Sequence, residues 1–488
     1  MTNHTPTDTP AERKELKFHG GWPLALTPVV LFLIACITLF VLLKAFEMSA
    51  LATGGFIALL LTAPLAKDYK AFWAAVIRGI GSPQAVSIVV ILLLIGPLST
   101  LNKATGVSDG FVWLAETVGA PPSTFTLFTF ITVCLVAMAT GSSIGTMFTA
   151  FPIFYVAGVS LGANPALLAG AIVSGAVFGD NLAPISDTSV MSASTQKYRN
   201  RRGVADVGGV VAARVRYSVV AAAISAVLYF ALGSVTGGSK LDLAAEGNPL
   251  GLTMLIPVAI LLVVAFWTRD IFKAITVGLV VGTITALVTG LLTPSDVLGV
   301  TDGAPSGFLI EGVEYMLGTV ALVIAVFGIV GTLMEARVID RVITWFSRAS
   351  WAGTPRGAEA AMGAGISATT VLFGGVNSAS MLAFGPVADE LGAKVGLHPY
   401  RRANVLDCFA LGVASTVPFL SAYLFIGALL ATQGGTPVSM GGLFLGTVYP
   451  IMLTLVMIVA VITGWGRTFE GSDGRALKTN PVLSDTPQ

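Results

Sequence analysis

The sequence predicts an all-α polytopic membrane protein built from two inverted-topology repeats with broken helices. Three observations support this fold class. Hydrophobic residues make up 55% of the 488 residues and charged residues only 11%, whereas about a quarter of a soluble domain is charged. Many apolar runs approach roughly 20 residues, the length of a membrane-spanning helix. A hydrophobic pattern over residues 91–195 returns over residues 323–425.

The two repeats are interrupted at matching places. The polar break 141–146 (GSSIGT) corresponds to 374–380 (GGVNSAS), and the break 179–184 (GDNLAP) corresponds to 412–418 (GVASTVP). Apolar helices that are broken at corresponding positions of two repeats are typical of secondary transporters, in which the breaks form the binding site.

Apolar runs predict about 12–14 membrane segments. Segments 147–160 and 380–392 are short, so re-entrant hairpin arms are an alternative to full spans for both. The expected segments are 22–44, 50–66, 84–101, 123–140, 147–160, 164–195, 217–236, 250–268, 274–292, 316–334, 361–376, 380–392, 403–430 and 442–464.

The distribution of basic residues predicts that the N- and C-termini are cytoplasmic. With that orientation and all segments crossing, only Lys44, Lys103 and Lys240 of the 27 Lys and Arg residues fall outside, as expected because positive charge accumulates on cytoplasmic loops. Segment 84–101 then enters from the cytoplasm and segment 316–334 from the outside. The repeats are therefore predicted to run in opposite directions.

This topology divides the chain into six parts. We expect a cytoplasmic tail (1–21), N-terminal scaffold helices (22–83), transport repeat 1 (84–216), linking helices (217–315), transport repeat 2 (316–441), and a last helix with a cytoplasmic tail (442–488).

The first repeat places two carboxylates, Asp180 and Asp187, on either side of Pro184 within an apolar stretch. Charged groups at membrane depth usually mark ion pathways, and a proline breaks or kinks the helix. The break leaves free carbonyls that can coordinate a cation. Asp180 and Asp187 are therefore predicted to bind Na⁺ or H⁺, with Asn181, Ser186 and Thr188 as neutral oxygen ligands. The alternative is that one aspartate only caps the helix after the break.

The second repeat carries one carboxylate, Asp407, and the polar pair Ser415 and Thr416 before Pro418. Asp407 either faces the cavity or pairs with an arginine such as Arg402. The other predicted ion or substrate ligands lie at the remaining breaks and are Ser142, Ser143, Thr146, Asn377 and Ser378. The predicted structural helix breaks are Gly179, Pro184, Gly374, Gly375, Gly412 and Pro418. Small-residue helix packing is the alternative explanation for the glycine-rich breaks.

Other charged and polar residues indicate no further chemistry. Asp389 and Glu390 are expected at an exposed segment end, and topology alone accounts for Arg401 and Arg402. The net charge of +1 gives no reason to expect a nucleic-acid partner. The sequence has no GxxxxGK[ST] phosphate loop and no spacing typical of catalytic triads or metal ligands. We therefore expect neither an enzyme nor a bound cofactor.

Residues 179–188 (GDNLAPISDT) resemble the signature of the NhaC Na⁺/H⁺ antiporter family, and the resemblance extends over roughly residues 80–465. The element 141–146 is similar to the family's Gly-Thr-Ser-Trp-Gly-Thr, with Ile144 in place of the aromatic residue. The family's Pro-Trp-Asn appears as Pro418-Phe419-Leu420. Asp407 stands where relatives often carry an acidic residue. The resemblance implies exchange of Na⁺ for H⁺ with Asp180 and Asp187 as the leading ion sites.

The sequence thus predicts a secondary active transporter, with Na⁺/H⁺ antiport by alternating access as the first reading. A Na⁺- or H⁺-coupled carrier of an amino acid or small organic acid is the alternative, and a channel or a membrane scaffold is a rival from another class. The expected partners are the lipid bilayer and a small ion or organic solute. The expected location is the bacterial inner membrane, and the architecture suggests a homodimer by analogy only.

Overall fold

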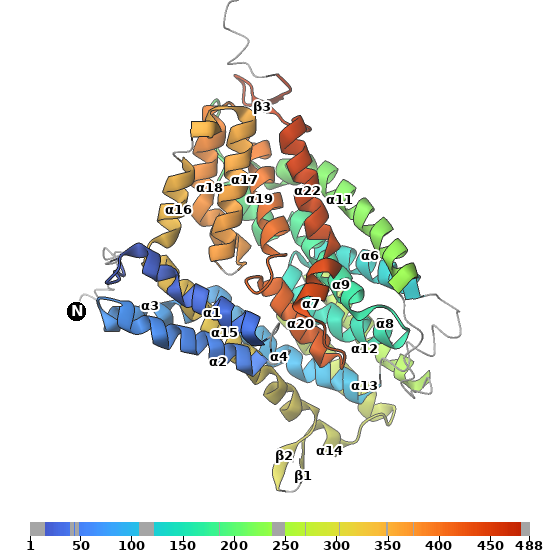
Figure 1. The fold of residues 1–488 in the computed structure, drawn as a ribbon. Coiled ribbons are helices and arrows are strands. Elements are labelled where there is room, and N and C mark those ends of the chain that lie inside the picture. The colour runs from blue at the N-terminus through green and yellow to red at the C-terminus, as the bar shows by residue number, and fades with distance from the viewer. Residues whose placement is uncertain are drawn as a thin grey trace, which may run out of the picture.

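The computed structural model describes residues 15–39, 43, 48–106, 122–184, 186–236, 249–268, 270–301, 303–347, 350–373 and 375–479. The described chain is mainly helical, as predicted (Figure 1). Gly374, a predicted helix break, lies outside the described residues.

The described residues up to 236 form no named strand but a series of helices. These are η1 (Trp22–Leu26), α1 (Thr27–Ile37), α2 (Met48–Thr62), η3 (Ala63–Leu65), α3 (Tyr69–Ile80), α4 (Pro83–Ala104), α6 (Pro122–Thr140), α7 (Ser143–Ala150), the π-helix η4 (Phe151–Tyr155), α8 (Val156–Ser160), α9 (Pro165–Leu182), α10 (Asp187–Ser194) and α11 (Val207–Thr236).

The part after residue 248 adds two small hairpins to the helices. It comprises η5 (Pro249–Met254), α12 (Leu255–Thr268), α13 (Ile271–Val288), α14 (Pro294–Val297), β1 (Gly299–Thr301), β2 (Ala304–Ser306), α15 (Phe308–Glu335), α16 (Val338–Ser347), η6 (Ser350–Gly353), α17 (Pro355–Leu372), α18 (Asn377–Lys394), α19 (Pro399–Ala414), α20 (Ala422–Gln433), α21 (Met440–Gly446), α22 (Val448–Thr463), β3 (Phe469–Glu470) and β4 (Ala476–Leu477). The strands pair as two antiparallel hairpins, β1 with β2 and β3 with β4.

Local sequence explains where many helices begin. Ser82, Asn164 and Thr354 each cap the helix that follows with a side-chain oxygen, and a proline occupies the first helical position. A cap satisfies an otherwise unpaired backbone N–H, and proline has no N–H to lose at that position. Short sequence motifs therefore mark the starts of these helices.

Five described helical stretches are long and apolar enough to cross a membrane, and a sixth results if the bent pair α21–α22 is counted as one span. Residues 143–160 form one of these stretches, so segment 147–160 lies within a helix of full membrane-spanning length. Several other apolar helices contain only 10–17 residues. The predicted total of 12–14 segments remains a prediction.

The helices form two groups (Figure 1). In the first group, α15 packs along α2, α3 and α4. Its close crossings depend on glycine, since a Cβ atom on Gly96 would overlap the carbonyl of Gly312 and one on Gly79 would overlap Gly331. The second group contains α6–α11 and α17–α22, in which α6 packs on α9 and α17 on α19.

Under the predicted repeat, helices α4, α6, α7–α8, α9 and α10 would correspond to α15, α17, α18, α19 and α20, whereas α16 and η6 have no counterpart among the described residues. The opening helices α4 and α15 pack against each other. The opposite orientation of the repeats relative to a membrane stays a prediction.

Candidate functional site

The break around Pro184 separates α9, which ends at Leu182, from α10, which begins at Asp187. The N-cap of α10 is Ser186, whose hydroxyl accepts a hydrogen bond from the Thr188 backbone N–H at 3.3 Å. The alternative in which Asp187 caps this helix is therefore wrong. Asp187 instead occupies the first turn, where a negative side chain is favoured by the helix dipole.

Three of the last four carbonyls of α9 accept hydrogen bonds, contrary to the expectation that the break leaves them free for a cation. The Gly179 carbonyl accepts a hydrogen bond from the Ala183 N–H at 2.7 Å. The Asp180 carbonyl accepts one from the Thr188 hydroxyl at 3.2 Å, and the Asn181 carbonyl accepts one from Arg214 at 2.6 Å. Any cation here must depend mainly on side-chain oxygens.

Asp180 is the central carboxylate of the site and is only 6% exposed. Its Oδ2 accepts a hydrogen bond from the hydroxyl of Ser143 at 2.7 Å, and its Oδ1 accepts one from the hydroxyl of Ser186. Hydroxyl groups that donate to an ionised carboxylate stabilise it. They can also turn to accept from a protonated carboxyl group, so this arrangement suits both states.

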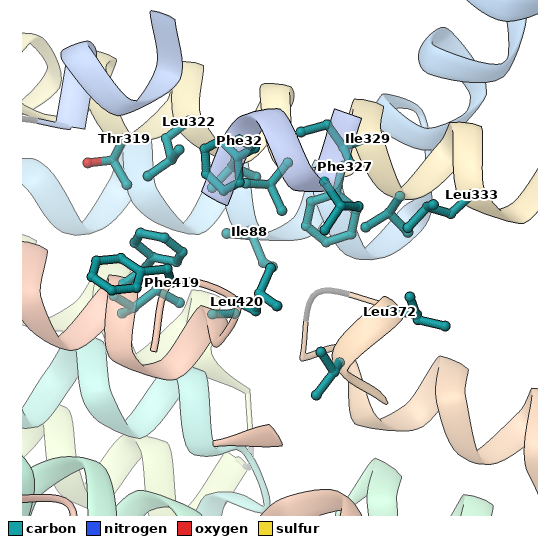
Figure 2. A pocket seen from close by; sticks show the side chains of 18 residues that line it. Phe32, Ile88, Thr319, Leu322, Phe327, Ile329, Leu333, Leu372, Phe419 and Leu420 are labelled. Carbon is teal, nitrogen blue, oxygen red and sulfur yellow. The ribbon is translucent and has the colours of Figure 1, made fainter. Parts of the chain in front are cut away.

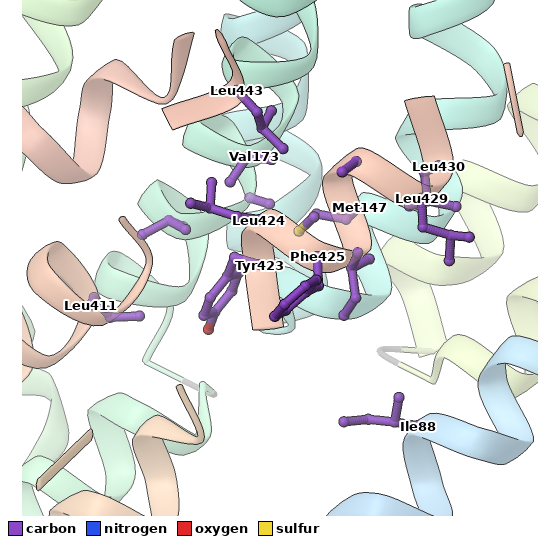
Figure 3. Packing of buried hydrophobic residues seen from close by; sticks show 14 of the residues in the cluster. Ile88, Met147, Val173, Leu411, Tyr423, Leu424, Phe425, Leu429, Leu430 and Leu443 are labelled. Atoms are coloured by element: carbon purple, nitrogen blue, oxygen red, sulfur yellow. The ribbon is translucent and has the colours of Figure 1, made fainter. Parts of the chain in front are cut away.

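A short hydrogen-bonded chain joins Asp180 to the second repeat. The hydroxyl of Ser143, at the start of α7, also lies 3.1 Å from the hydroxyl of Tyr423 in α20. The Tyr423 hydroxyl accepts a further hydrogen bond from the side-chain amide of Asn377 at 3.0 Å. The ring of Tyr423 packs among buried apolar side chains (Figure 3). Residues near breaks of the two predicted repeats therefore lie together here.

A cavity of about 380 Å³ opens beside this chain. Its wall contains the predicted site residues Ser142, Ser143, Asp180, Asp187, Thr188, Gly375, Asn377 and Ser378, together with Tyr423 and the α4 residues Pro83, Ser87, Ile88 and Ile91. No Lys, Arg or His is among the described residues that line the cavity. It is therefore an acidic compartment rich in hydroxyl and amide oxygens.

Other predicted ligands lie outside the cavity wall. Thr146 is buried and its hydroxyl bonds to that of Thr140 at 3.0 Å. Thr416 turns its hydroxyl back onto the carbonyls of Gly412 and Val413 at 3.1 and 2.9 Å, which closes the end of α19. Ser415 is fully buried. Ser186 contacts the site only through Asp180 and Thr188.

Two of the predicted helix breaks are instead packing positions within helices. Gly179 lies in α9, where a Cβ atom would overlap Ala137 of α6, and Gly412 lies in α19 against Thr454 of α22. Pro184 and Pro418 both lie in the non-helical segments that follow α9 and α19, which end at Leu182 and Ala414. Gly375 also belongs to a break and has a φ of 86°, a conformation that favours glycine.

Asn181 and Asp407 face away from the cavity and belong to a second buried network. The Asn181 side-chain amide donates to Asp407 at 2.8 Å, and its oxygen accepts from the hydroxyls of Ser218 and Tyr449. Asp407 forms an ion pair with Arg214, and both side chains are completely buried. The sequence left open whether Asp407 faces the cavity or pairs with an arginine such as Arg402; its ion-pair partner is Arg214.

Arg402 pairs with Asp389 at 2.6 Å, and Arg199 contacts the same carboxylate at 2.8 Å. The prediction that Asp389 is exposed is therefore wrong, since it is 5% exposed. Arg401 is also buried and pairs with Glu359 at 2.8 Å, so topology alone does not account for Arg401 and Arg402. Glu390, in contrast, is exposed as expected and pairs with Lys394.

Two further cavities adjoin the acidic one. An apolar cavity of about 120 Å³ lies between α1, α4 and α15 on one side and Phe419, Leu420 and α20 on the other (Figure 2), and it shares Ile88 with the acidic cavity. A cavity of about 320 Å³ is lined by Arg78, Glu335 and other residues, and it shares Val376 with the acidic cavity. All three follow the boundary between the two helix groups.

A resident metal centre is not evident in the described part of the chain, which contains no group of three His, Cys, Asp or Glu side chains that could hold an ion. Tyr423 and Arg214 are the main residues that sequence reasoning missed. Tyr423 carries no charge to reveal it. Arg214 could have been recognised because it lies two turns inside an apolar helix, where charge is rare.

Comparisons with known proteins identify relatives among transporters. Residues 18–233 match the model of the Na⁺/H⁺ antiporter family. The chain is 31% identical over 315 residues to the malate-2H⁺/Na⁺-lactate antiporter of Bacillus subtilis (strain 168), which covers 60% of this chain and 64% of that protein. It is 27% identical over 286 residues to the Na⁺/H⁺ antiporter NhaC of Alkalihalophilus pseudofirmus, which covers 53% of this chain and 58% of that protein.

The matched regions thus span less than two thirds of the length of these curated relatives. Among solved structures, the YdaH transporter of Alcanivorax borkumensis aligns over 86% of this chain and 99% of that chain, with 13% identity and a TM-score of 0.38.

Proposed function

We propose, from the match of residues 18–233 to the Na⁺/H⁺ antiporter family model, that the protein is a secondary active transporter that exchanges Na⁺ for H⁺. It would act in the bacterial inner membrane with both termini in the cytoplasm. The transported ions are its substrates, and the proposal requires neither a cofactor nor enzymatic chemistry.

One observation carries the proposal: Asp180 and Asp187 line a cavity that has oxygen ligands and no cationic side chain among the described residues. Na⁺ is a hard cation that oxygen ligands suit. A proton and Na⁺ compete for one carboxylate, because protonation removes the charge that attracts the cation. Binding of one substrate therefore displaces the other, which is the minimum requirement for exchange.

The hydroxyl groups of Ser143 and Ser186 would keep Asp180 in place in both states. Around the bound Na⁺, the neutral ligands would come from Ser142, Thr188 and Asn377, which also line the cavity. Alternating access would require the site to open in turn to each side of the membrane. The adjoining cavities along the boundary between the helix groups support relative movement there.

The test is dissipation of a pH gradient in everted membrane vesicles on addition of Na⁺, Li⁺ or K⁺. We expect a response to Na⁺ or Li⁺ that Asp180→Asn abolishes. Asp206→Asn is the matched control because Asp206 is an exposed carboxylate whose partner is Tyr400, outside the cavity. Normal Na⁺-dependent flux in Asp180→Asn would contradict the assignment of the site.

Cavity volume supports a second candidate, the coupled transport of a small organic acid. A volume of about 380 Å³ exceeds the need of one Na⁺, since a water molecule occupies about 30 Å³ in the liquid. The N-terminus of α18, with Asn377 and Ser378, also lines the cavity and could accept a carboxylate. The Bacillus subtilis relative is named for malate and lactate. A response of the vesicles only to organic acids, and not to Na⁺ alone, would favour this candidate.

A further inference from the structure

Arg214 is a buried residue whose guanidinium group contacts both helices that flank the break at Pro184. It lies in α11, is 0% exposed, and uses every nitrogen of its guanidinium group. Nη1 donates to the Asn181 carbonyl at 2.6 Å and to the Ser189 hydroxyl at 3.0 Å. Nη2 donates to the Ser192 hydroxyl at 3.1 Å. The group thus joins the end of α9 to α10 across the break.

The same guanidinium reaches the second repeat. Its Nε donates to the Asn404 side-chain oxygen at 3.0 Å, and Nη1 pairs with Asp407, so both partners lie on α19. Asp407 also accepts a hydrogen bond from the Asn181 side chain. Asn181 is consequently held at its backbone carbonyl by Arg214 and at its side chain by the partner of Arg214.

Asp180 is the residue that this arrangement positions. It precedes Asn181 in the chain, and successive residues of an α-helix point about 100° apart because there are 3.6 residues per turn. With Asn181 fixed toward α11 and α19, Asp180 is turned toward the cavity and Ser143. We propose that Arg214 is a positioning residue for substrate binding: it sets the orientation of Asp180 and the distance between α9 and α10. The inference rests on the proposed function for the identity of the substrate.

A lysine cannot form the same set of hydrogen bonds as the Arg214 guanidinium group. Its ammonium group is a point charge with three donors, whereas the planar guanidinium group presents five donors in a fixed fork. Arg214→Lys therefore keeps the charge that balances Asp407 but loses some of the contacts across the break. Arg401→Lys is the matched control, because Arg401 is 2% exposed and its hydrogen-bond partners among the described residues are Glu359, Tyr217, Ala460 and Trp465, none of which belongs to α9 or α10.

The experiment compares Na⁺ exchange by these two variants in vesicles that contain equal amounts of folded protein. For Arg214→Lys we expect the apparent KM for Na⁺ to rise on the order of tenfold, as is typical when a residue that orients a ligand is lost, with a smaller change in maximal rate. For Arg401→Lys we expect no change in KM. An unchanged KM in Arg214→Lys, or an equal rise in both variants, would overturn the proposal.

A second measurement does not depend on transport. Cys36, Cys134 and Cys408 are buried, so a cysteine introduced in Asp187→Cys can be labelled selectively by a water-soluble maleimide. We expect Arg214→Lys to change the labelling rate at this position and Arg401→Lys to leave it unchanged. If the wild-type protein does not exchange Na⁺, the proposed function is wrong. If Arg214→Lys leaves the labelling rate at position 187 unchanged, the proposal that Arg214 positions the site is wrong.

Discussion

The hydroxyl of Ser143 donates a 2.7 Å hydrogen bond to the carboxylate of Asp180, so two breaks of the first repeat that are 37 residues apart in sequence meet directly. The contact joins Ser143, at the start of α7, to Asp180, a leading ion site predicted from the sequence. The following predictions test this site and the fold that supports it.

Ser143→Ala removes one of the two hydroxyl groups that donate to Asp180. A hydrogen bond to a charged group contributes about 1.5 kcal/mol or more, so we expect the apparent KM for Na⁺ to rise about tenfold. Initial rates of Na⁺-dependent proton flux measure this. Ser194→Ala is the control, since Ser194 is exposed and bonds only to its own helix. An unchanged KM in Ser143→Ala would show that the contact does not support binding.

Tyr423→Phe breaks the connection between the repeats while keeping the buried ring. The variant removes the acceptor of the Asn377 amide and the neighbour of the Ser143 hydroxyl. A buried donor without a partner costs about 1–3 kcal/mol, so we expect a roughly tenfold fall in exchange rate. Tyr315→Phe is the control because Tyr315 is 47% exposed. Equal rates in the two variants would contradict the prediction.

Gly96→Ala tests the crossing of α4 and α15. Its new methyl group would overlap the carbonyl of Gly312, and overpacking of this kind typically destabilises a protein by about 1–3 kcal/mol. Thermal unfolding of the detergent-purified protein should begin at a lower temperature. Gly441→Ala, whose Cβ atom would meet nothing within 4 Å, should leave unfolding unchanged. Equal stability of both variants would show that the crossing can shift to accommodate the added methyl group.

His398 should make stability fall at acidic pH. Its Nδ1 accepts a hydrogen bond from the Tyr400 N–H at 3.2 Å at the start of α19, which only a ring unprotonated at Nδ1 can do. Burial lowers the pKa of His398 below its ordinary value. The stability it contributes is therefore fully present above the ordinary pKa of about 6.5 and is lost as pH falls through the lower value in the folded protein.

Unfolding temperatures measured over a pH series check this sign. His398→Asn keeps a capping side chain but does not titrate, so its stability should decline less than that of the wild type below about pH 6.5. A parallel decline in both proteins would assign the acid sensitivity to other groups.

Orientation can be tested at the hairpin of β3 and β4. Asp473 lies between these strands with a side chain 56% exposed, and the native cysteines are buried. An impermeant maleimide should label Asp473→Cys in everted vesicles and not in right-side-out vesicles. The reverse result would invert the proposed topology.

The predicted helix breaks illustrate what the sequence could and could not specify. A proline disrupts a helix in any sequence context, so the break at Pro184 could be predicted from the local sequence. The candidate role of Asp180 could be predicted in the same way, because the carboxylate lies close to that break. The different roles of Asp180 and Asn181 also follow from helical periodicity, although the prediction gave them the same role. The partner of Asp407 could not be read in this way, because Arg214 is 193 residues away and only the packing of α11 on α19 joins them.

Asp389 is a second residue whose role could not be predicted from the local sequence. A carboxylate near the end of an amphipathic segment is usually solvated, and nothing in its local sequence reveals that Arg199 and Arg402 approach it from two other parts of the chain. Tyr423 is similar, because an aromatic residue in an apolar helix has an ordinary packing role unless its hydroxyl finds polar partners. Contacts between the repeats determined these roles.

Glu470 accepts hydrogen bonds from the backbone N–H groups of Arg199 and Asn200, both at 2.8 Å. It is synthesised 270 residues after Asn200. The loop after α10 consequently leaves the ribosome long before the carboxylate that secures it. The first repeat can enter the membrane during translation, but the face formed by this loop is completed only when the hairpin that carries Glu470 has emerged and docked.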